Sequence, residues 1–361
     1  PRAARVHPRM SGEDKAEIRR QMRRLRRDLS EEEQQHAADG VYAQVIRMDC
    51  YRTARTVMAY AAVRGELSMR RIMEDIRASG RLLALPRCGE SGDMDAFIVT
   101  EQRQLRQGAY GIWEPDESCP IVPPDAIDLM LIPGTELDFL LPTQAVHLLG
   151  LGVSPDIADC WNPNGTPQQA IDSIRACGGR AVLAHPAWSL NTTELMCSFR
   201  GLSGVEIFNS VSSVPTNALR GDSAAMLDPV FANGQLLNCF ANDDSHRYEG
   251  ECGMSATMLN TDDRSVAGVL RAIDEGRFYA TQGPEIRELS LTDGVLHIAC
   301  SPAKYIIFYS NEVWIPNRTR AVEGQTSADY VVSPRETFVR VQVVAEDGKS
   351  AWTSPINTIS R

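Results

Sequence analysis

The stretch DLMLIPGTELD, from Asp128 to Asp138, joins two kinds of sequence, and its two halves predict different structures. The apolar run 129–132 predicts a buried strand, which Pro133-Gly134 ends. The turn then delivers Glu136 directly after that strand, at the edge where α/β proteins keep their chemistry. A carboxylate in that position predicts a functional site, and the residues on either side of the stretch indicate which kind.

The composition bounds the class of protein. The chain has 361 residues, enough for two or three domains, and its 43% apolar and 23% charged residues are typical of a soluble protein with a large core. A net charge of -10 disfavours nucleic acid as a partner, because phosphate binding requires a basic surface. The basic run from Lys15 to Arg27 predicts a solvated helix face, with an anion site for one or two residues as the alternative.

Targeting and redox signals favour the cytoplasm. The nine cysteines are scattered and form no CxxC pair, which is typical of a reduced chain. No apolar run approaches the ~20 residues of a membrane span, and the first residues lack the apolar core of a signal peptide. We therefore expect a cytoplasmic protein with no membrane partner. Residues 1–13 are predicted to be a disordered or upstream tail, and the oligomeric state stays open.

Before Gly134 the apolar pattern alternates between helix and strand. Helical spacing covers residues 13–47, where a capping box from Ser30 to Glu33 opens a second helix. Strands are predicted at 56–62, 81–87 and 94–99, and a further helix at 69–80. This alternation predicts a parallel or mixed sheet covered by helices.

The alternation continues beyond Gly134 and changes near residue 287. A helix is predicted at 166–179, with Thr166 as its N-cap and Pro167 in its first turn. Strands are predicted at 180–186, 204–209 and 235–246, and a helix followed by a short strand at 265–281. From residue 287 onward, period-two alternation and Asp-Gly turns predict a small antiparallel β unit.

Histidines and carboxylates gather at the predicted strand ends. His185 ends an apolar strand, and Asp244 and His246 end another, where an extended chain would point both side chains the same way. Glu136 and His147 add a further carboxylate and imidazole. Carboxylates and imidazoles on one face bind divalent metal ions, so the pattern predicts a metal site. The alternative is a set of ordinary polar residues at strand ends.

The motifs GTEL, HLLGLG, AVLAHPAWS, GVEIFN and NDDSH resemble, in this order, the polymerase-and-histidinol-phosphatase (PHP) family of metal-dependent phosphoesterases. The resemblance implies a (βα)7-like barrel with up to three metal ions at its strand ends. It implies that Glu136 bridges metal ions and that His147 and His185 complete one site with it. Asp244 and His246 would belong to the other two. The ions, Zn, Mn or Fe, would activate water to attack a small phosphorylated substrate.

One part of the PHP pattern is missing from this chain. The family opens with an H-x-H strand and then has a further Asp and His before the glutamate, whereas the only histidines upstream of Glu136 are His7 and His36. The implied barrel is therefore incomplete at its N-terminal side. We expect its activity to be impaired.

The residues before the junction resemble another family, the 5-formyltetrahydrofolate cyclo-ligases. The resemblance runs from about Asp14 to Gly134 and rests on LS-x-E-E, VMAYAAVRGELSM, LLALPR, MDAF, GIWEP and DLMLIPG. It implies ATP and Mg as cofactors and a folate substrate. Lys15 and Arg19 would contact the ATP phosphates, Arg87 the nucleotide region, and Glu66 the folate.

The cyclo-ligase pattern is also incomplete. That family continues with a Phe-Asp and a glycine-rich ATP loop, G-x-R-L-G-x-G-x-G-Y-Y-D. Asp138 could serve as the aspartate, and residues 149–152 (LGLG) imitate the loop faintly, but its arginine, last glycine and tyrosine pair are absent. We therefore expect no ATP-dependent turnover of 5-formyltetrahydrofolate.

Together these patterns predict an α/β protein in three parts. A ligase-like segment at 14–133 precedes an incomplete PHP-type barrel at 134–286 and a small antiparallel β domain at 287–361. The expected function is that of a metal-dependent phosphoesterase, a hydrolase. The alternatives are a cyclo-ligase relative of folate metabolism that lacks its ATP loop, and a non-catalytic fusion product.

Overall fold

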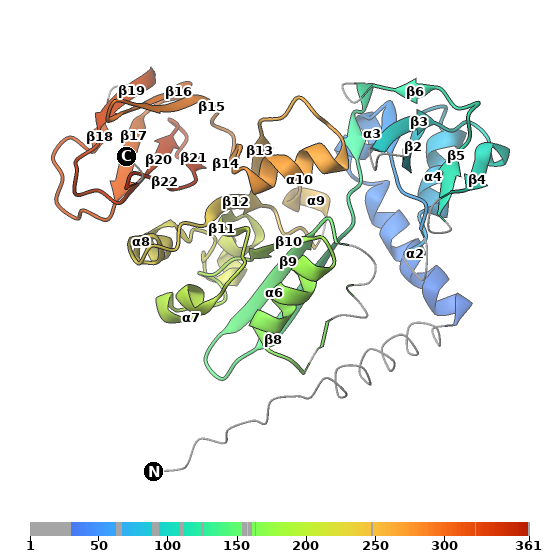
Figure 1. Cartoon of the computed structure of the whole chain (residues 1–361), viewed down its shortest axis with the longest axis horizontal. Helices are drawn as coiled ribbons and strands as arrows, with labels where there is room; N and C mark the ends of the chain where they lie inside the picture. The colour runs from blue at the N-terminus through green and yellow to red at the C-terminus, as the bar shows by residue number, and fades with distance from the viewer. Residues whose placement is uncertain are drawn as a thin grey trace, which may run out of the picture. The chain divides into compact units, whose positions relative to one another are not determined.

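The chain forms two compact units. The computed structural model describes residues 30–62, 67–88, 94–108, 112–123, 126–153, 157, 161–162, 164–246, 248–321 and 323–359. Unit 1 comprises residues 1–131 and 153–178, and unit 2 comprises residues 132–152 and 179–361. The boundary falls inside the DLMLIPGTELD stretch, so strand β7 (Leu129–Met130) lies in unit 1 and β8 (Gly134–Leu140) in unit 2 (Figure 1). The predicted tail 1–13 lies outside the described residues.

Unit 1 is built on a mixed five-stranded sheet with the order β6-β3-β2-β1-β7. Strand β1 (Thr56–Met58) pairs in parallel with β2 (Leu82–Cys88) and with β7. Strands β3 (Met94–Ile98) and β6 (Ile121–Val122) extend the sheet, with β3 antiparallel to β2 and β6 antiparallel to β3. The remaining described elements are the helices α2 (Glu31–Val45), α3 (Asp49–Thr53), α4 (Arg70–Ala78) and α6 (Pro167–Ala176), the 3-10 helix η1 (Gln102–Gln104), and the pair β4 (Leu105–Gln107) and β5 (Trp113–Pro115).

The core of unit 1 follows from the apolar spacing of its helices and strands. Ile72 and Ile76, four positions apart on one face of α4, are 1% and 0% exposed. They belong to one cluster with Val57, Leu83 and Leu85 from the two parallel strands. The helix ends where Gly80 adopts a φ of +73°, a conformation that costs glycine little. The predicted strand–helix–strand order is confirmed, and the protein is of the mixed α/β class.

Helix α6 (Pro167–Ala176) forms where its capping sequence predicted it. The side-chain hydroxyl of Thr166 accepts a hydrogen bond from the backbone N–H of Gln169, and the Gln169 side chain accepts from the backbone N–H of Thr166. Pro167 occupies the first turn, where no intrahelical donor is needed. The predicted N-cap is therefore confirmed.

Unit 2 contains a second five-stranded sheet with the order β12-β11-β10-β9-β8. Strands β10 (Arg180–Leu183), β11 (Gly204–Asn209) and β12 (Asn238–Asn242) are parallel. Strand β9 (Ala145–Leu151) runs antiparallel to β10 and forms a hairpin with β8. The helices are α7 (Thr193–Ser198), α8 (Ala224–Ala232), α9 (Tyr248–Glu251) and α10 (Val266–Asp274), with 3-10 turns η4 (Val211–Ser213) and η5 (Pro215–Asn217).

This sheet differs from the predicted incomplete (βα)7 barrel. Its described strands follow an open path, and two neighbouring strands form a hairpin instead of a strand–helix repeat. Leu137 and Phe139 are buried on one face of β8, and Val146 and Leu148 on one face of β9, in the period-two pattern of a hairpin with one covered face. Pro133-Gly134 was expected to end a strand, but a new strand begins at Gly134.

The C-terminal residues form the predicted antiparallel β structure. A seven-stranded sheet has the order β13-β14-β21-β20-β17-β18, with β22 paired to β20, and a three-stranded sheet has the order β15-β16-β19. Two of these strands, β13 (Ala256–Leu259) and β14 (Phe278–Thr281), precede residue 287. The others are β15 (Ile286–Thr292), β16 (Val295–Ala303), β17 (Tyr305–Ser310), β18 (Thr319–Arg320), β19 (Gln325–Val331), β20 (Phe338–Val344), β21 (Ser350–Thr353) and β22 (Ile356–Asn357).

The seven-stranded C-terminal sheet contacts both the parallel strand β11 and helix α8 of unit 2. The rings of Phe208 and Trp352 stack with centroids 5.4 Å apart, and Trp352 is 1% exposed. The guanidinium of Arg340 donates to both carboxylate oxygens of Asp228 at 2.7 and 2.9 Å. In the described part of the chain, no helix is both long and apolar enough to cross a lipid bilayer.

Candidate functional site

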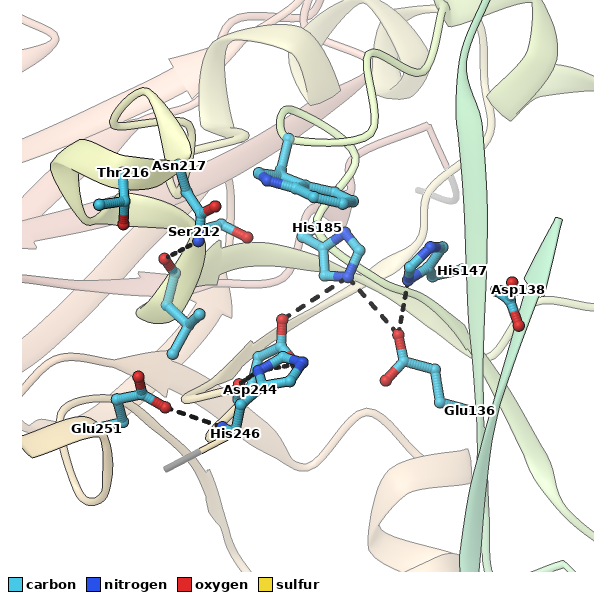
Figure 2. Close-up of a pocket in the computed structure, with 12 residues that line it drawn as sticks. Glu136, Asp138, His147, His185, Ser212, Thr216, Asn217, Asp244, His246 and Glu251 are labelled. Carbon is cyan, nitrogen blue, oxygen red and sulfur yellow. Dashed lines mark hydrogen bonds and ion pairs between the residues drawn. The ribbon is translucent and has the colours of Figure 1, made fainter. Parts of the chain in front are cut away.

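A cavity of about 720 Å³ opens at the carboxyl ends of the parallel strands of unit 2 (Figure 2). Such strand ends are the usual position of ligand sites in α/β sheets. The lining side chains are mostly polar or ionisable: Glu136, Asp138, His147, His185, Trp188, Val211, Ser212, Thr216, Asn217, Asp244, His246 and Glu251.

Three of the predicted site residues converge on one point of this cavity. Nδ1 of His147 donates to Oε1 of Glu136 at 2.8 Å, and Nε2 of His185 lies 3.7 Å from the same oxygen. One potential ligand atom from each residue lies within 4.8 Å of those of the other two. Figure 2 shows the carboxylate of Glu136 pointing at both rings. One carboxylate and two imidazoles form a donor set that suits a divalent transition metal.

The hairpin explains how Glu136 and His147 meet. In its register Asp138 lies opposite His147, and Glu136 lies opposite Leu149. Side chains two positions apart share a face of a strand, so Glu136 reaches His147 diagonally across the pair. The sequence predicted both residues but not the hairpin that brings them together.

His185 is held firmly from several sides. It follows β10 with a φ of +26°, an unusual value for a residue with a side chain, and it is 3% exposed. Its backbone N–H donates to Oε2 of Glu206 at 2.8 Å, and its Nδ1 is hydrogen-bonded to the Ser189 hydroxyl at 3.0 Å. These contacts leave Nε2 directed toward Glu136 and Asp244. A fixed imidazole whose other nitrogen has a partner is the usual arrangement of a metal ligand.

Asp244 and His246 line the cavity in different ways. Oδ2 of Asp244 lies 3.8 Å from Nε2 of His185, whereas the side chain of His246 is 73% exposed. The expected extended D-x-H segment is not observed, because Asp244 adopts a φ of +57° and bends the chain. His246 is turned back instead, and its Nδ1 is hydrogen-bonded to the carbonyl oxygen of Asp244 at 2.8 Å.

The ionisable groups of the cavity perturb one another. The hydrogen bond from His147, followed by the contact with His185, lowers the pKa of Glu136 to about 2 despite partial burial. Burial acts to lower the pKa of His185, but the nearby carboxylates of Glu136, Glu206 and Asp244 outweigh it, and the net shift is upward. Burial raises the pKa of Asp244. The site thus holds an ionised carboxylate beside two imidazoles, an arrangement that suits a bound cation.

Of the four residues predicted to contact the nucleotide or the folate, Arg87 is the one that the structure describes. Lys15, Arg19 and Glu66 lie outside the described residues. The guanidinium of Arg87 donates to the carbonyl oxygen of Asp116 at 2.9 Å and lies 3.7 Å from the centroid of the Phe97 ring. These two contacts give Arg87 a structural role inside unit 1.

Three residues around the cavity were missed by the sequence analysis. Glu206 is 2% exposed in the middle of β11, and Asn209 and Asn242 donate their side-chain N–H groups to it at 2.9 and 2.6 Å. A signal was present in GVEIFN, where one carboxylate interrupts an apolar strand. A buried carboxylate requires partners, and here those partners lie behind the site.

Comparisons with known proteins concern only the N-terminal part of the chain. Residues 11–139 match the model of the 5-formyltetrahydrofolate cyclo-ligase family. The NMR structure of Aquifex aeolicus 5,10-methenyltetrahydrofolate synthetase is 27% identical over 33% of this chain and 60% of its own, with a TM-score of 0.29. The synthetase from Mycoplasma pneumoniae is 18% identical over 33% and 63%, with a TM-score of 0.24. A search of curated proteins gives no match.

These similarities characterise the N-terminal segment alone. Residues 11–139 are cyclo-ligase-like, as the sequence motifs suggested. The chain spans about 60% of the length of the solved synthetases, so their complete activity is not carried over. TM-scores this low support no inference about the fold.

The predicted PHP-type phosphoesterase is wrong. The family model that matches, over residues 11–139, is that of the cyclo-ligases, and it favours the alternative interpretation, a cyclo-ligase relative, over a PHP phosphoesterase. The assignment as a hydrolase is wrong for the same reason, whereas the small phosphorylated substrate stays a prediction. The physical reason lies in the sequence before Glu136, which encodes a ligase-like sheet instead of the H-x-H strand that a complete PHP site requires.

Proposed function

We propose that this chain is a relative of the 5-formyltetrahydrofolate cyclo-ligases that binds a reduced folate through its N-terminal segment. The match of residues 11–139 to that family carries the proposal. Glu66 would accept hydrogen bonds from the amino groups of the pterin ring. Lys15, Arg19 and Arg87 would meet the phosphates and nucleotide of ATP bound with Mg, because cations offset phosphate charge.

The chemistry of the family sets what a complete enzyme must do. Closing a second carbon–nitrogen bond at the formyl carbon requires the formyl oxygen to leave. Phosphoryl transfer from ATP to that oxygen makes it a leaving group, and 5,10-methenyltetrahydrofolate, ADP and phosphate are the products. Since the glycine-rich loop is missing after Gly134, we expect ligand binding without turnover.

Calorimetric titration with 5-formyltetrahydrofolate tests the proposal. The wild-type protein is expected to bind, and Glu66→Ala to lose binding. Glu74→Ala, which removes an exposed carboxylate paired with Arg70 on α4, is the matched control and should bind normally. Absence of binding by the wild-type protein would refute the proposal. ATP-dependent formation of the methenyl product would instead overturn the expectation that the loop is required.

A second function, binding of a divalent metal ion in unit 2, is favoured by the convergence of Glu136, His147 and His185 within 4.8 Å. Asp244 is the nearest additional donor, 3.8 Å from Nε2 of His185, and His246 lies at the edge of the cavity. Zn, Mn and Fe suit this donor set. A bound ion would supply Lewis acidity to an oxygen of whatever ligand enters the cavity.

Metal analysis after dialysis against Zn or Mn tests the second function. His147→Ala should abolish stoichiometric binding. The chain contains a matched control, because Nδ1 of His297 donates to Oδ1 of Asp329 at 2.6 Å on the exposed surface of the three-stranded sheet. His297→Ala removes an equivalent imidazole–carboxylate pair and should leave binding unchanged. Equal metal content in both variants would refute the site.

A further inference from the structure

Glu206 is a buried carboxylate with no lysine or arginine paired to it in the described part of the chain. It lies in the middle of β11, is 2% exposed, and forms no ion pair with a lysine or arginine among the described residues. Burial raises the pKa of Glu206, and His185 and the two asparagine amides oppose that shift. Carboxylates are seldom kept in a protein core without a purpose or several hydrogen bonds.

The hydrogen bonds of Glu206 join the ends of all three parallel strands. Oε2 accepts from the backbone N–H of His185, which follows β10, and from Nδ2 of Asn209, which ends β11. Oε1 accepts from Nδ2 of Asn242, which ends β12, at 2.6 Å. All three partners are N–H donors, and only a carboxylate accepts on both of its oxygens.

The same network reaches the two residues with strained backbone at the cavity. His185 and Asp244 have φ values of +26° and +57°. The N–H of His185 is bound by Glu206 directly, and Oδ2 of Asp244 accepts from Nδ2 of Asn209 at 3.3 Å. Backbone conformations of this kind persist only where surrounding contacts enforce them.

We propose that Glu206 is the positioning residue of the candidate metal site. It holds His185 directly, and Asp244 through Asn209, so that their donor atoms face the cavity. The inference rests on the metal-binding function proposed above and adds a residue to it. Glu206 itself is not among the residues that line the cavity.

Cobalt titration followed by visible absorption tests this role, because the spectrum of bound Co²⁺ reports ligand number and geometry. Glu206→Met removes every acceptor at similar volume and should weaken Co²⁺ binding about 10–100-fold, the usual effect of losing an outer-shell partner. Glu206→Gln keeps an oxygen for the N–H of His185 if the amide of Asn242 rotates, so its loss should be smaller. If Glu206→Met fails to fold, Glu206→Gln alone carries the test.

A buried carboxylate elsewhere in unit 2 provides the matched control. Glu336 is 3% exposed and accepts from the Tyr330 hydroxyl at 2.7 Å and from the backbone N–H of Ser333 at 2.7 Å. Glu336→Gln should bind Co²⁺ with the affinity and spectrum of the wild-type protein. A merely structural contribution of Glu206 would lower thermal stability in both variants without altering the cobalt spectrum.

Hydrogen exchange in the metal-free protein gives a second readout. The amide of His185 should exchange faster in Glu206→Met than in the wild-type protein. Unchanged cobalt affinity and spectrum in both Glu206 variants, or an unchanged amide, would overturn the positioning role while leaving the metal site intact. Failure of the wild-type protein to bind Co²⁺ would overturn the site and this inference together.

Discussion

The two units use the same kind of sheet and differ at the ends of its strands. In unit 1, β1 pairs in parallel with β2 and β7, and the described residues that follow these two strands within the unit, residues 59–62 and Leu131, include no carboxylate or imidazole. In unit 2, the parallel strands β10 and β12 lead into His185 and Asp244, which line one cavity, and β11 ends at Asn209, which donates to Asp244. Strand geometry is therefore shared, and the described residues after each strand decide whether a carboxylate–imidazole cluster forms there.

The buried charges sharpen the contrast. Unit 2 encloses Arg340 completely, with Asp228 as its partner, and Glu206 almost completely. The main ion pair of unit 1, between Arg81 and Asp75, keeps 14% and 30% of its side chains exposed. Removing a polar partner should therefore cost far more in unit 2 than in unit 1.

The largest effect is expected from Asp228→Ala. It leaves the fully buried guanidinium of Arg340 without its carboxylate, and one of its nitrogens, Nη1, already has no hydrogen-bond partner in the described part of the chain. The free energy of unfolding should fall by about 3–5 kcal/mol. Denaturant titration measures this loss of stability. Amide hydrogen exchange shows where it occurs, and the amides of unit 2 are expected to lose protection from exchange.

The double variant Asp228→Leu with Arg340→Met is the control for this prediction. It removes both charges and should recover most of the lost stability, because no ion then remains buried alone. Equal destabilisation by the single and double variants would show that shape, and not charge, maintains this contact. Equal loss of protection in unit 1 would show that both units unfold together.

Glu136→Ala should come next. It removes the only carboxylate of the three-residue cluster and should weaken divalent-metal binding more than the ~10–100-fold typical of an outer-shell partner. Binding of 5-formyltetrahydrofolate should not change, because the proposed folate contact is made by Glu66 and not by Glu136. Calorimetry with each ligand measures both effects. Asp329→Ala, which removes the carboxylate beside His297, should alter neither.

Tyr51→Phe should have a moderate effect within unit 1. The hydroxyl of Tyr51 donates to Oδ2 of Asp75 at 2.7 Å, and Asp75 retains Arg81 and partial exposure when that bond is lost. The free energy of unfolding should fall by about 1.5 kcal/mol, which is the lower end of the range for a hydrogen bond to a charged group. Tyr42→Phe, which loses a longer bond of 3.3 Å to the same carboxyl, should cost less. Urea denaturation measures both changes, and a larger loss of unfolding free energy in Tyr42→Phe than in Tyr51→Phe would contradict this explanation.

The smallest effect is expected from Asp128→Asn, at the start of the DLMLIPGTELD stretch. Backbone N–H groups of Thr56 and Arg55 donate to Oδ2 of Asp128, and they hold its pKa below the ordinary value. The stabilisation is present above the unfolded pKa of about 3.9 and is lost as pH falls through the folded pKa. Urea midpoints of wild type and variant should differ slightly at pH 7 and coincide at pH 2, whereas a constant difference would exclude ionisation as the cause.

Much of the fold was predictable from local signals. The apolar spacing of α4 and the cap at Thr166 depend on neighbouring residues, and both elements form where expected. The hairpin of β8 and β9 was missed because Pro133-Gly134 indicates a stop, while the strand that begins there is held by pairing with residues that come later in the chain.

The site was predictable in its residues and not in its geometry. Glu136, His147 and His185 were identified from their positions near strand ends, and the structure brings them together. The bend at Asp244 was not foreseen, because a left-handed backbone at an aspartate is set by tertiary contacts such as that with Asn209. The function was predicted wrongly because short motifs after residue 134 outweighed the continuous family match before it.

Unit 2 is interrupted in the sequence, because residues 153–178 cluster with unit 1 while residues 132–152 do not. A single proteolytic cut or stop codon therefore cannot release either unit intact. Separate expression of unit 2 would need β9 joined to β10 by a short linker across the excised segment.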